Sequence, residues 1–534
     1  MMATANQVAQ ALQKSLMVDL HKTPAVSAPT LSELREIADR NNIHLSEDDL
    51  KEYQEFMRES VKAMTRIDRL PEPTLPVKYP RIPGYRPPPE ENLHNAWYWK
   101  TQIEGAKSGK LLGKKIAIKD TVMVAGVPMM NGCRALEGYT ADTDATIVTR
   151  ILDAGGTISG KSTNENLCFS GSSFTTGKGP VLNPHDPTRS AGGSSSGSAV
   201  LVATGEVDMA IGGDQGGSIR LPAAWSGIVG LKPTFGLVPY TGAMGLDGSI
   251  DHLGPMAKTV QDCALLLEVI AGYDNGLDPR QPTNIAVPEY SKEIQVDRLD
   301  GIKVGLLKEG FGFPESDPRV DEAVRNAVRK LESVGAEVVD VSIPLHYESG
   351  SIWSAVGFTG SSNIILDGAG FGSGYNGFYP TSLITTAGMA FRSQTNDFDP
   401  SIKASIMLGD YMQSHYYGKY YAKAQNLRRL LRDAYDQTFD KCDVIAMPTI
   451  PFLPTKLPKD GCSIKDYLGL LATVNLNTKC ADATLHPSIS LNAGFLNNLP
   501  VGIQLTAGMF QETVLLKVAH VIEKQIIASN GPTC

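Results

Sequence analysis

The 534-residue sequence lacks a stretch of 18 consecutive apolar residues, and it also lacks closely paired cysteines. A helix that crosses a membrane needs about 20 apolar residues, so we expect no membrane-spanning segment and no membrane partner. The seven cysteines are scattered and form no CxxC pair, which indicates neither a disulfide framework nor a zinc site. This pattern fits a reducing compartment, and we expect a cytoplasmic protein.

Histidine motifs and an excess of positive charge are missing as well. The nine histidines are dispersed, and neither an HExxH motif nor a Cys/His cluster occurs. We therefore expect no metal and no other cofactor. The net charge of −8 argues against nucleic acid as a partner. Residues 1–20 have no basic segment followed by an apolar one, so we expect no secretory or mitochondrial signal.

Proline marks a boundary near the start of the chain. Eight prolines fall within the 19 residues from Pro71 to Pro89, a density typical of an extended linker. We expect three regions: an N-terminal helical region at 1–70, a proline-rich linker at 71–92, and an α/β domain at 93–534 with a more variable helical lobe at about 300–480.

The N-terminal region is predicted to hold two helices. Thr30 is expected to cap the first, because Glu33 follows three residues later. Ser46 is expected to begin the second, longer helix, whose apolar residues follow helical spacing. We expect this hairpin to pack on the main body, and dimerisation is the alternative use of its apolar face. The chain as a whole is expected to form a homodimer.

Alternating strands and helices run from Leu112 to Pro255, which predicts an α/β layered fold. Two serines within this region, Ser194 and Ser218, each follow a Gly-Gly pair and lie 24 positions apart. Glycine pairs permit sharp turns and leave backbone N–H groups uncovered, so these groups can face a reacting oxygen. The sequence thus predicts serines presented at turns beside an anion-binding nest.

A serine nucleophile needs a base, and no histidine of the chain stands out for that role. Lys119 is the best candidate, because the apolar strand Ile116–Ile118 leads directly into it. A neutral lysine near pH 7–8 needs its pKa lowered by roughly 3 units, or about 4 kcal/mol, which burial can supply. The alternative is a structural lysine that pairs with Asp120 or ends the strand, and spacing alone does not separate the two.

These residues lie in segments that resemble the amidase signature hydrolases, and the resemblance covers about 93–534. It rests on IAIKD at 116–120, AGGSSSGSA at 191–199 and the long DQGGSIRLPAAWSGIVGLKPT at 214–234. The resemblance implies a mixed, twisted β-sheet core covered by helices. It also implies hydrolysis of amide carbon–nitrogen bonds through an acyl-enzyme.

The family's Ser–cis-Ser–Lys triad falls on three residues of this chain. The resemblance implies that Ser218 attacks the carbonyl, that Ser194 relays the proton, and that neutral Lys119 accepts it. The peptide bond between Gly193 and Ser194 is expected to be cis.

Further residues around the triad are assigned in the same way. The backbone N–H groups of an oxyanion hole are expected from Gln215, Gly216, Gly217 and Ser218. Ser195 is expected to bond to the lysine or to the relay serine, and Asp214 and Arg220 to pair with each other. This chain has Ser196-Gly197 where the common family sequence has two glycines, and we expect activity to survive the change.

Within the family, the sequence is most similar to amidases that accompany nitrile hydratases. This resemblance suggests Phe169 and Trp353 as apolar walls of the acyl pocket; the alternative is that both are ordinary core aromatics. We expect a small-molecule amide, aliphatic or aromatic, as substrate. Carbamates (urethanes) and esters present the same carbonyl geometry, and the sequence leaves open whether they are substrates too.

Three other functions have some support in the sequence. The segment GGTISGKS at 155–162 matches a phosphate-loop pattern, but a helix is predicted before it and a strand within it, the reverse of the order required. A glutaminase subunit of a tRNA-dependent amidotransferase would share the fold, yet the N-terminal helices, the acidic charge and Gln215 favour an amidase that acts alone. A silent binding protein is disfavoured because all three triad positions are filled.

Overall fold

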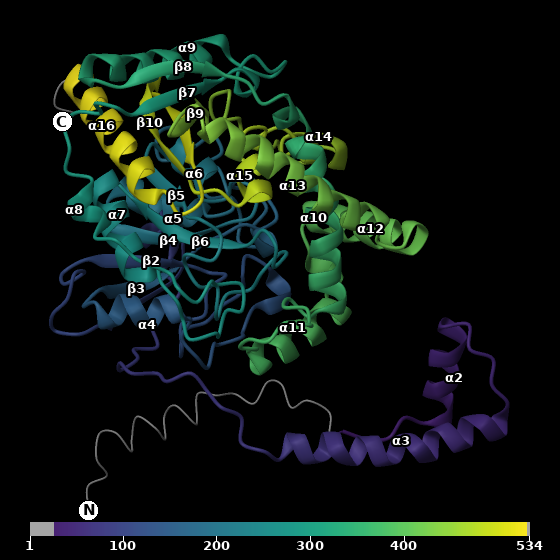
Figure 1. Ribbon diagram of the computed structural model, residues 1–534. Helices are drawn as coiled ribbons and strands as arrows, with labels where there is room; N and C mark the ends of the chain where they lie inside the picture. Colours follow the sequence, from purple (N-terminus) through teal and green to yellow (C-terminus); the bar gives the residue numbers. More distant parts are fainter. Residues whose placement is uncertain (1–25, 531–534) are drawn as a thin grey trace, which may run out of the picture. The chain divides into compact units, whose positions relative to one another are not determined.

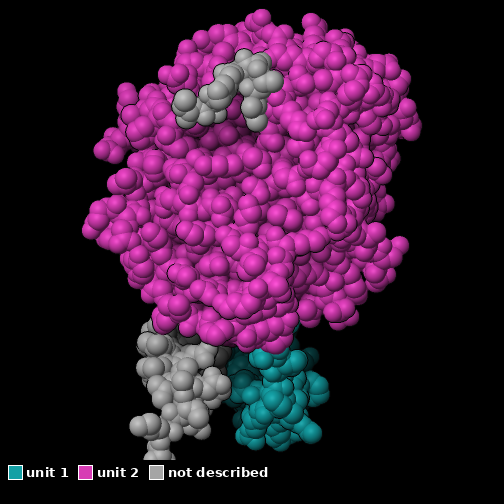
Figure 2. Space-filling view, turned by 90° about the vertical axis from the view of Figure 1, so that its left-hand side faces the viewer, with its two compact units in different colours: residues 1–75 teal, residues 76–534 magenta. Residues whose placement is uncertain are grey.

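The computed structural model describes residues 26–530, which fall into two compact units divided between Leu75 and Pro76 (Figure 2). The division lies inside the proline-rich segment. Residues 76–92 belong to the second unit, where the backbones of Tyr85 and Lys100 exchange hydrogen bonds of 2.9 Å. Residues 1–25 of the predicted helical region, and the last four residues, lie outside the described part.

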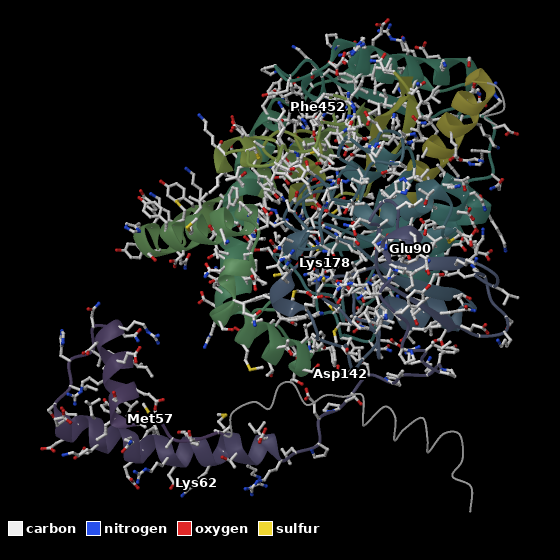
Figure 3. All side chains as sticks on the ribbon, turned by 180° about the vertical axis from the view of Figure 1, so that it is seen from behind. Met57, Lys62, Glu90, Asp142, Lys178 and Phe452 are labelled. Carbon is white, nitrogen blue, oxygen red and sulfur yellow. The ribbon has the colours of Figure 1, made fainter. Side chains whose placement is uncertain are left out.

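The first unit contains the two predicted helices, α2 (Leu31–Arg40) and α3 (Glu47–Asp68). Thr30 caps α2 as predicted, and Ser46, where the second helix was expected to begin, caps α3. In each case the side-chain oxygen accepts a hydrogen bond from the backbone N–H three residues later. Figure 3 labels Met57 and Lys62, which α3 carries.

The apolar side chains of this unit differ in burial. Leu34 and Leu50 are buried, whereas Phe56, Met64 and Ile67 of α3 remain largely exposed. The spacing of apolar residues in the sequence therefore predicted helix α3 correctly. Within the described residues, however, only part of the apolar face of α3 is covered.

The second unit is built on one large sheet, with described strand order β1-β3-β2-β4-β6-β5-β10-β11-β9-β7-β8 (Figure 1). β2 runs parallel to β3 and β4, and β7 runs parallel to β8 and β9, while the other pairs are antiparallel. The sheet is mixed, as expected. The strands are β1 (Trp97–Glu104), β2 (Lys115–Lys119), β3 (Thr157–Ser162), β4 (Met209–Asp214), β5 (Val229–Lys232), β6 (His252–Ala257), β7 (Lys303–Leu307), β8 (Glu337–Val341), β9 (Val444–Pro448), β10 (Ser488–Leu496) and β11 (Leu499–Ala507).

Helices flank this sheet, and α10–α13 form a separate helical group in the region where a helical lobe was expected (Figure 1). The longer helices α7 and α16 pack against strands β6 and β10 respectively. The helices of this unit are α4 (Thr146–Asp153), α5 (Ser196–Thr204), α6 (Arg220–Ser226), α7 (Val260–Ile270), α8 (Tyr290–Glu293), α9 (Pro318–Arg329), α10 (Ser349–Ser362), α11 (Thr381–Ser393), α12 (Pro400–Tyr416), α13 (Lys419–Phe439), α14 (Ile464–Gly469), α15 (Lys479–Thr484) and α16 (Glu512–Asn530).

Helix α5 lies deep in the core because its residues are small. Its residues from Ser196 to Val202 are all buried. A Cβ placed on Gly197 would lie 2.4 Å from the carbonyl oxygen of Ala96 and 2.6 Å from that of Thr163. Only glycine permits this close approach of helix to neighbouring backbone. The approach fixes the position of the turn just before α5, which contains Ser194.

The phosphate-loop match does not have the geometry of such a loop. Its residues from Thr157 onward form strand β3, and its lysine, Lys161, is fully buried with Nζ 3.0 Å from a carboxylate oxygen of Asp120. A phosphate loop requires a helix to begin at the lysine. In the described range, no helix is long and apolar enough to span a bilayer.

Candidate active site

Lys119 and Ser194 meet at the end of strand β2. Lys119 is the last residue of β2, and its Nζ lies 2.8 Å from Ser194 Oγ and 3.1 Å from the carbonyl oxygen of Gly213. Both side chains are fully buried. The peptide bond between Gly193 and Ser194 is cis. The two residues stand 75 positions apart in the sequence, and the strand end and the glycine turn bring their polar atoms into hydrogen-bond contact.

Lys119 has no carboxylate within ion-pair distance among the described residues. Burial lowers the pKa of its ammonium, and the nearby Cys168 and Asp214 only partly oppose this effect. The alternative in which Lys119 pairs with Asp120 is wrong, because Asp120 pairs with Lys161 on the neighbouring strand. A buried lysine that contacts a hydroxyl and a carbonyl, with no anion beside it, has the environment of a neutral base.

Ser218 lies in the glycine turn that follows strand β4. Its carbonyl oxygen accepts a hydrogen bond of 3.1 Å from the backbone N–H of Ser195, so this turn is held against the turn that carries Ser194. Ser218 is 6% exposed, whereas Lys119 and Ser194 have no exposed surface. Within the described part, the Ser218 hydroxyl makes no hydrogen bond. Of the three side chains, this one can be reached from outside.

The turn from Gln215 to Ser218 offers fewer free amides than predicted. The N–H of Gly217 donates to Asp214 Oδ1 at 2.6 Å, so it is not available to a substrate oxygen. This corrects the expectation that all four amides line an oxyanion hole. The amides of Gln215, Gly216 and Ser218 are engaged by no acceptor in the described residues, and they remain candidates for anion binding.

Asp214 and Arg220 pair as predicted and hold the turn from both sides. Arg220 donates from Nε and Nη2 to the two carboxylate oxygens of Asp214, at 3.0 and 3.1 Å. It also binds Asp482 at 2.8 Å and Gln504 at 2.9 Å. Burial alone would raise the pKa of Asp214, but the Arg220 guanidinium holds that pKa well below its ordinary value. The turn that carries Ser218 therefore rests on a buried, charged network.

Ser195 does not bond to the lysine or to the relay serine. Its hydroxyl donates to the carbonyl oxygen of Gly213 at 3.2 Å and accepts from the N–H of Gly213 at 3.1 Å. The expectation is corrected because the backbone of β4 passes closer to Ser195 than the side chains of Lys119 or Ser194 do. Ser195 influences Lys119 only through Gly213, whose carbonyl oxygen both residues contact.

Ser196, where this chain departs from the common family sequence, makes a side-chain hydrogen bond that glycine could not make. Ser196 Oγ donates to Glu165 at 2.8 Å, and Thr175 donates to the same carboxylate from its N–H and its hydroxyl, at 2.7 Å each. Burial raises the pKa of Glu165 to about 7, although these hydrogen bonds act in the opposite direction. Glu165 lies directly behind the cis peptide, since a Cβ on Gly193 would be 2.8 Å from its Cγ.

Phe169 and Trp353 lie together beside the turn from Gln215 to Ser218. Their ring centroids are 6.4 Å apart, and Phe358 lies 5.7 Å from Phe169. The indole Nε1 of Trp353 donates to the carbonyl oxygen of Gln215 at 2.5 Å. Trp353 is therefore more than an ordinary core aromatic, because it fixes one residue of the turn that presents the free amides.

Two residues at this turn were missed by reasoning from the sequence. Thr478 Oγ1 donates to the carbonyl oxygen of Gly216 at 2.7 Å, and the Nζ of Lys479 lies 4.8 Å from the centroid of the Trp353 ring. Both residues come from a segment about 260 positions after the turn, and no local motif marks that segment. Only the fold brings them to the site.

A cavity of about 440 Å³ lies elsewhere, and its walls include Asp120, Asn164 and Thr176 but none of Lys119, Ser194 and Ser218. None of the three candidate site residues therefore lines this cavity. Among residues 26–530, no cluster of histidine, cysteine or carboxylate side chains has the arrangement of a metal site.

Comparisons with known proteins were consistent with each other. A family model described as Amidase matches residues 85–516. The chain is 42% identical over 459 residues to an enantioselective amidase from Rhodococcus rhodochrous, a match that covers 85% of this chain and 88% of the relative. It is 37% identical over 448 residues to a Glutamyl-tRNA(Gln) amidotransferase subunit from Methanosarcina acetivorans, with 83% and 90% covered. Among solved structures, the native peptide amidase from Stenotrophomonas maltophilia matches with a TM-score of 0.62 at 26% identity, over 78% of this chain and 83% of that chain.

Proposed function

This chain belongs to the amidase signature family and is a hydrolase of amide carbon–nitrogen bonds, and from that premise we propose that it cleaves small aliphatic and aromatic amides through Ser218, Ser194 and Lys119. The observation that carries the proposal is the buried contact of 2.8 Å between Lys119 Nζ and Ser194 Oγ, with no carboxylate beside the amine.

The proposed reaction has two halves. Ser218 Oγ attacks the amide carbonyl, its proton passes to Ser194 Oγ, and the proton of Ser194 passes to Lys119 Nζ. When the tetrahedral intermediate collapses, the carbon–nitrogen bond breaks and the proton returns through Ser194 to the leaving ammonia or amine. Water then attacks the Ser218 ester by the same relay and releases the carboxylic acid.

The negative charge of the tetrahedral oxygen needs donors that are already in place. We assign this role to the backbone N–H groups of Gln215, Gly216 and Ser218, and we leave Gly217 out because Asp214 occupies its N–H. Loss of one such donor typically lowers the rate by roughly 10²–10³-fold. The network of Asp214 and Arg220 supports this role by fixing the turn.

The substrate preference follows from the aromatic side chains. Phe169 and Trp353 form the proposed apolar wall of the acyl pocket, and Phe358 extends the cluster. An apolar wall favours hydrophobic acyl groups. Carbamates and esters, which place the same carbonyl over Ser218, are proposed as secondary substrates.

A glutaminase that works within a larger complex is the second candidate, and its support is the 37% identity to a Glutamyl-tRNA(Gln) amidotransferase subunit. Such a protein would hydrolyse glutamine together with partner chains. The 42% identity to an enantioselective amidase favours the enzyme that acts alone.

The test measures kcat/KM of the purified enzyme on a panel of substrates: benzamide, an aliphatic amide, an anilide, an ester, an alkyl carbamate and glutamine. We expect the simple amides to be the best substrates and the variant Ser218→Ala to turn over none of them. Hydrolysis of glutamine alone, and only when partner chains are added, would contradict the proposal.

For assembly, we propose a homodimer that does not bind nucleic acid, in accord with the net charge of −8 and with the exposed Phe56, Met64 and Ile67 of α3. Light scattering of the full chain tests it, and a mass of one chain at micromolar concentration would contradict it. A cytoplasmic setting stays a prediction from the scattered cysteines.

A further inference from the structure

Lys479 places an amine at the aromatic wall of the proposed acyl pocket. It is the first residue of α15, and its Nζ lies over the face of the Trp353 ring, 4.8 Å from the centroid. The side chain is neither fully buried nor exposed. Solvent therefore reaches an amine that the protein surrounds on most sides, as expected for a group on the wall of a concave site.

The amine has no polar partner of its own within residues 26–530, which separates it from the fully buried lysines Lys119, Lys161 and Lys232. Lys119 contacts Ser194 and Gly213, Lys161 pairs with Asp120, and Lys232 donates to the carbonyl oxygen of Pro233 at 2.9 Å. For Lys479, burial lowers the pKa to about 8, and no neighbouring anion opposes the effect. A partly desolvated ammonium without an acceptor is an unfavourable arrangement unless something binds to it.

Two contacts tie this amine to the reacting centre. The ring that it covers, Trp353, donates to the carbonyl oxygen of Gln215, and the preceding residue, Thr478, donates to that of Gly216. Gln215 and Gly216 belong to the turn that leads into Ser218. An acyl group seated against Trp353 would therefore have its carbonyl at the free amides and its far end near the amine.

We propose that Lys479 is a specificity-determining residue that binds a carboxylate on the acyl part of the substrate, so that monoamides of dicarboxylic acids are preferred over neutral amides of the same shape. The inference rests on the proposed function, since it names the substrate class of the same site. The carboxylate is not altered in the reaction. It supplies the hydrogen-bonding anion that the ammonium lacks, in a position where the aromatic rings limit access of water.

The test uses pairs of amides that differ in one charge. Terephthalamate is compared with 4-acetylbenzamide, in which a neutral acetyl group replaces the carboxylate, on the wild type and on Lys479→Met and Lys479→Arg. We expect the wild type to favour terephthalamate by roughly 10- to 100-fold in kcat/KM, the range expected of a hydrogen bond to a charged group. Lys479→Met should lose this preference through a higher KM for terephthalamate, so that the ratio of kcat/KM for the two amides falls to about one.

The control is Lys465→Met, which removes an exposed lysine from α14 and should leave the ratio unchanged. Lys479→Arg keeps the charge and should keep most of the preference. The inference is overturned if the wild type shows no preference for the charged amide, or if Lys479→Met lowers both rates equally.

A binding measurement separates failure of this inference from failure of the proposed function. Calorimetry on Ser218→Ala, with terephthalamate and 4-acetylbenzamide as probes, needs no turnover. Tighter binding of terephthalamate that disappears when Lys479→Met is added supports the inference whatever the amide panel shows. Equal binding in both backgrounds overturns it, even if neutral amides are hydrolysed as proposed.

Discussion

The two walls of the active site differ in how far their polar groups are satisfied. The rear wall comprises Lys119, Ser194 and Glu165, which are fully buried and hydrogen-bonded to other parts of the chain. The front wall comprises Ser218 with the amides of Gln215 and Gly216, together with the amine of Lys479, and its polar groups have no partner in the described structure. A buried polar group without a partner is costly. We therefore expect a substrate to bind at the front wall.

The largest expected effect comes from Lys119, the proposed base on the rear wall. We expect Lys119→Met to lower kcat/KM on a simple amide by about 10³-fold or more, because the proton from Ser218 then has no acceptor. In the wild type, kcat/KM should rise with pH, since the base acts in its neutral form and burial lowers its pKa below the ordinary value of 10.5. The variant should lack this pH-dependent limb.

The control for that experiment is Lys161→Met, which removes an equally buried lysine whose partner is Asp120. It should reduce stability, because a buried carboxylate is left without its cation. It should nevertheless retain the pH-dependent limb in the folded fraction. If kcat/KM of this control no longer rises with pH, or if kcat/KM of Lys119→Met still rises with pH, the assignment of Lys119 as the base is contradicted.

The next effect concerns the network behind the turn of the front wall. Asp214→Asn leaves Arg220 buried with only part of its positive charge compensated, and breaking such a pair typically costs about 3–5 kcal/mol. We expect the free energy of unfolding, measured with urea, to fall by an amount in this range. Asp297→Asn, which removes a surface partner of Lys524, is the matched control and should change it by less than about 1 kcal/mol.

Glu165 on the rear wall should make stability depend on pH. Its folded pKa of about 7 lies above the ordinary value of 4.5, so the folded state retains a proton that the unfolded state has released. The free energy of unfolding should therefore fall as pH rises from about 4.5 to 7, by up to about 3 kcal/mol from this group.

In Glu165→Gln this component disappears, so the pH slope should become shallower than in the wild type. Asp251 and Glu523, whose pKa values burial also raises to about 7, contribute equally to both proteins. Thermal unfolding at a series of pH values measures the slope. An identical slope in the two proteins would show that Glu165 does not titrate in this range.

The smallest effect is expected at Ser195. Among the described residues, its hydroxyl bonds to the backbone of Gly213 alone, so it contacts neither the side chains of the proposed proton relay nor the front wall. We expect Ser195→Ala to lower kcat by less than about tenfold and to leave the pH profile unchanged, in line with the loss of one neutral hydrogen bond. If Ser195→Ala lowered the catalytic rate as much as Lys119→Met does, Ser195 would belong to the proton relay. The two walls would then no longer differ in the way described.

How much could be predicted from the sequence depended on the range of the contacts. The helix starts at Thr30 and Ser46 depend on contacts between residues close in the sequence, and the structure confirms both starts. The contact of Lys119 with Ser194 was expected from the resemblance to the amidase signature hydrolases, because the strand end and the glycine turn alone left the role of Lys119 open.

Contacts that depend on side-chain direction or on distant segments were not foreseeable. The use of the Gly217 amide by Asp214 and the attachment of Ser195 to Gly213 follow from the local turn geometry, which the sequence does not specify. Thr478 and Lys479 reach the site only because α15 packs against α10, which carries Trp353.

The central claim is that Ser218 on the front wall is the nucleophile and that Lys119 on the rear wall activates it. The most direct measurement treats the wild type with a fluorophosphonate, locates the phosphonylated peptide by mass spectrometry, and compares the labelling rate with that of Lys119→Met. We predict a single label on Ser218, formed at least about 100-fold more slowly in the variant. A label on Ser194, or an equal rate in the two proteins, would contradict the claim.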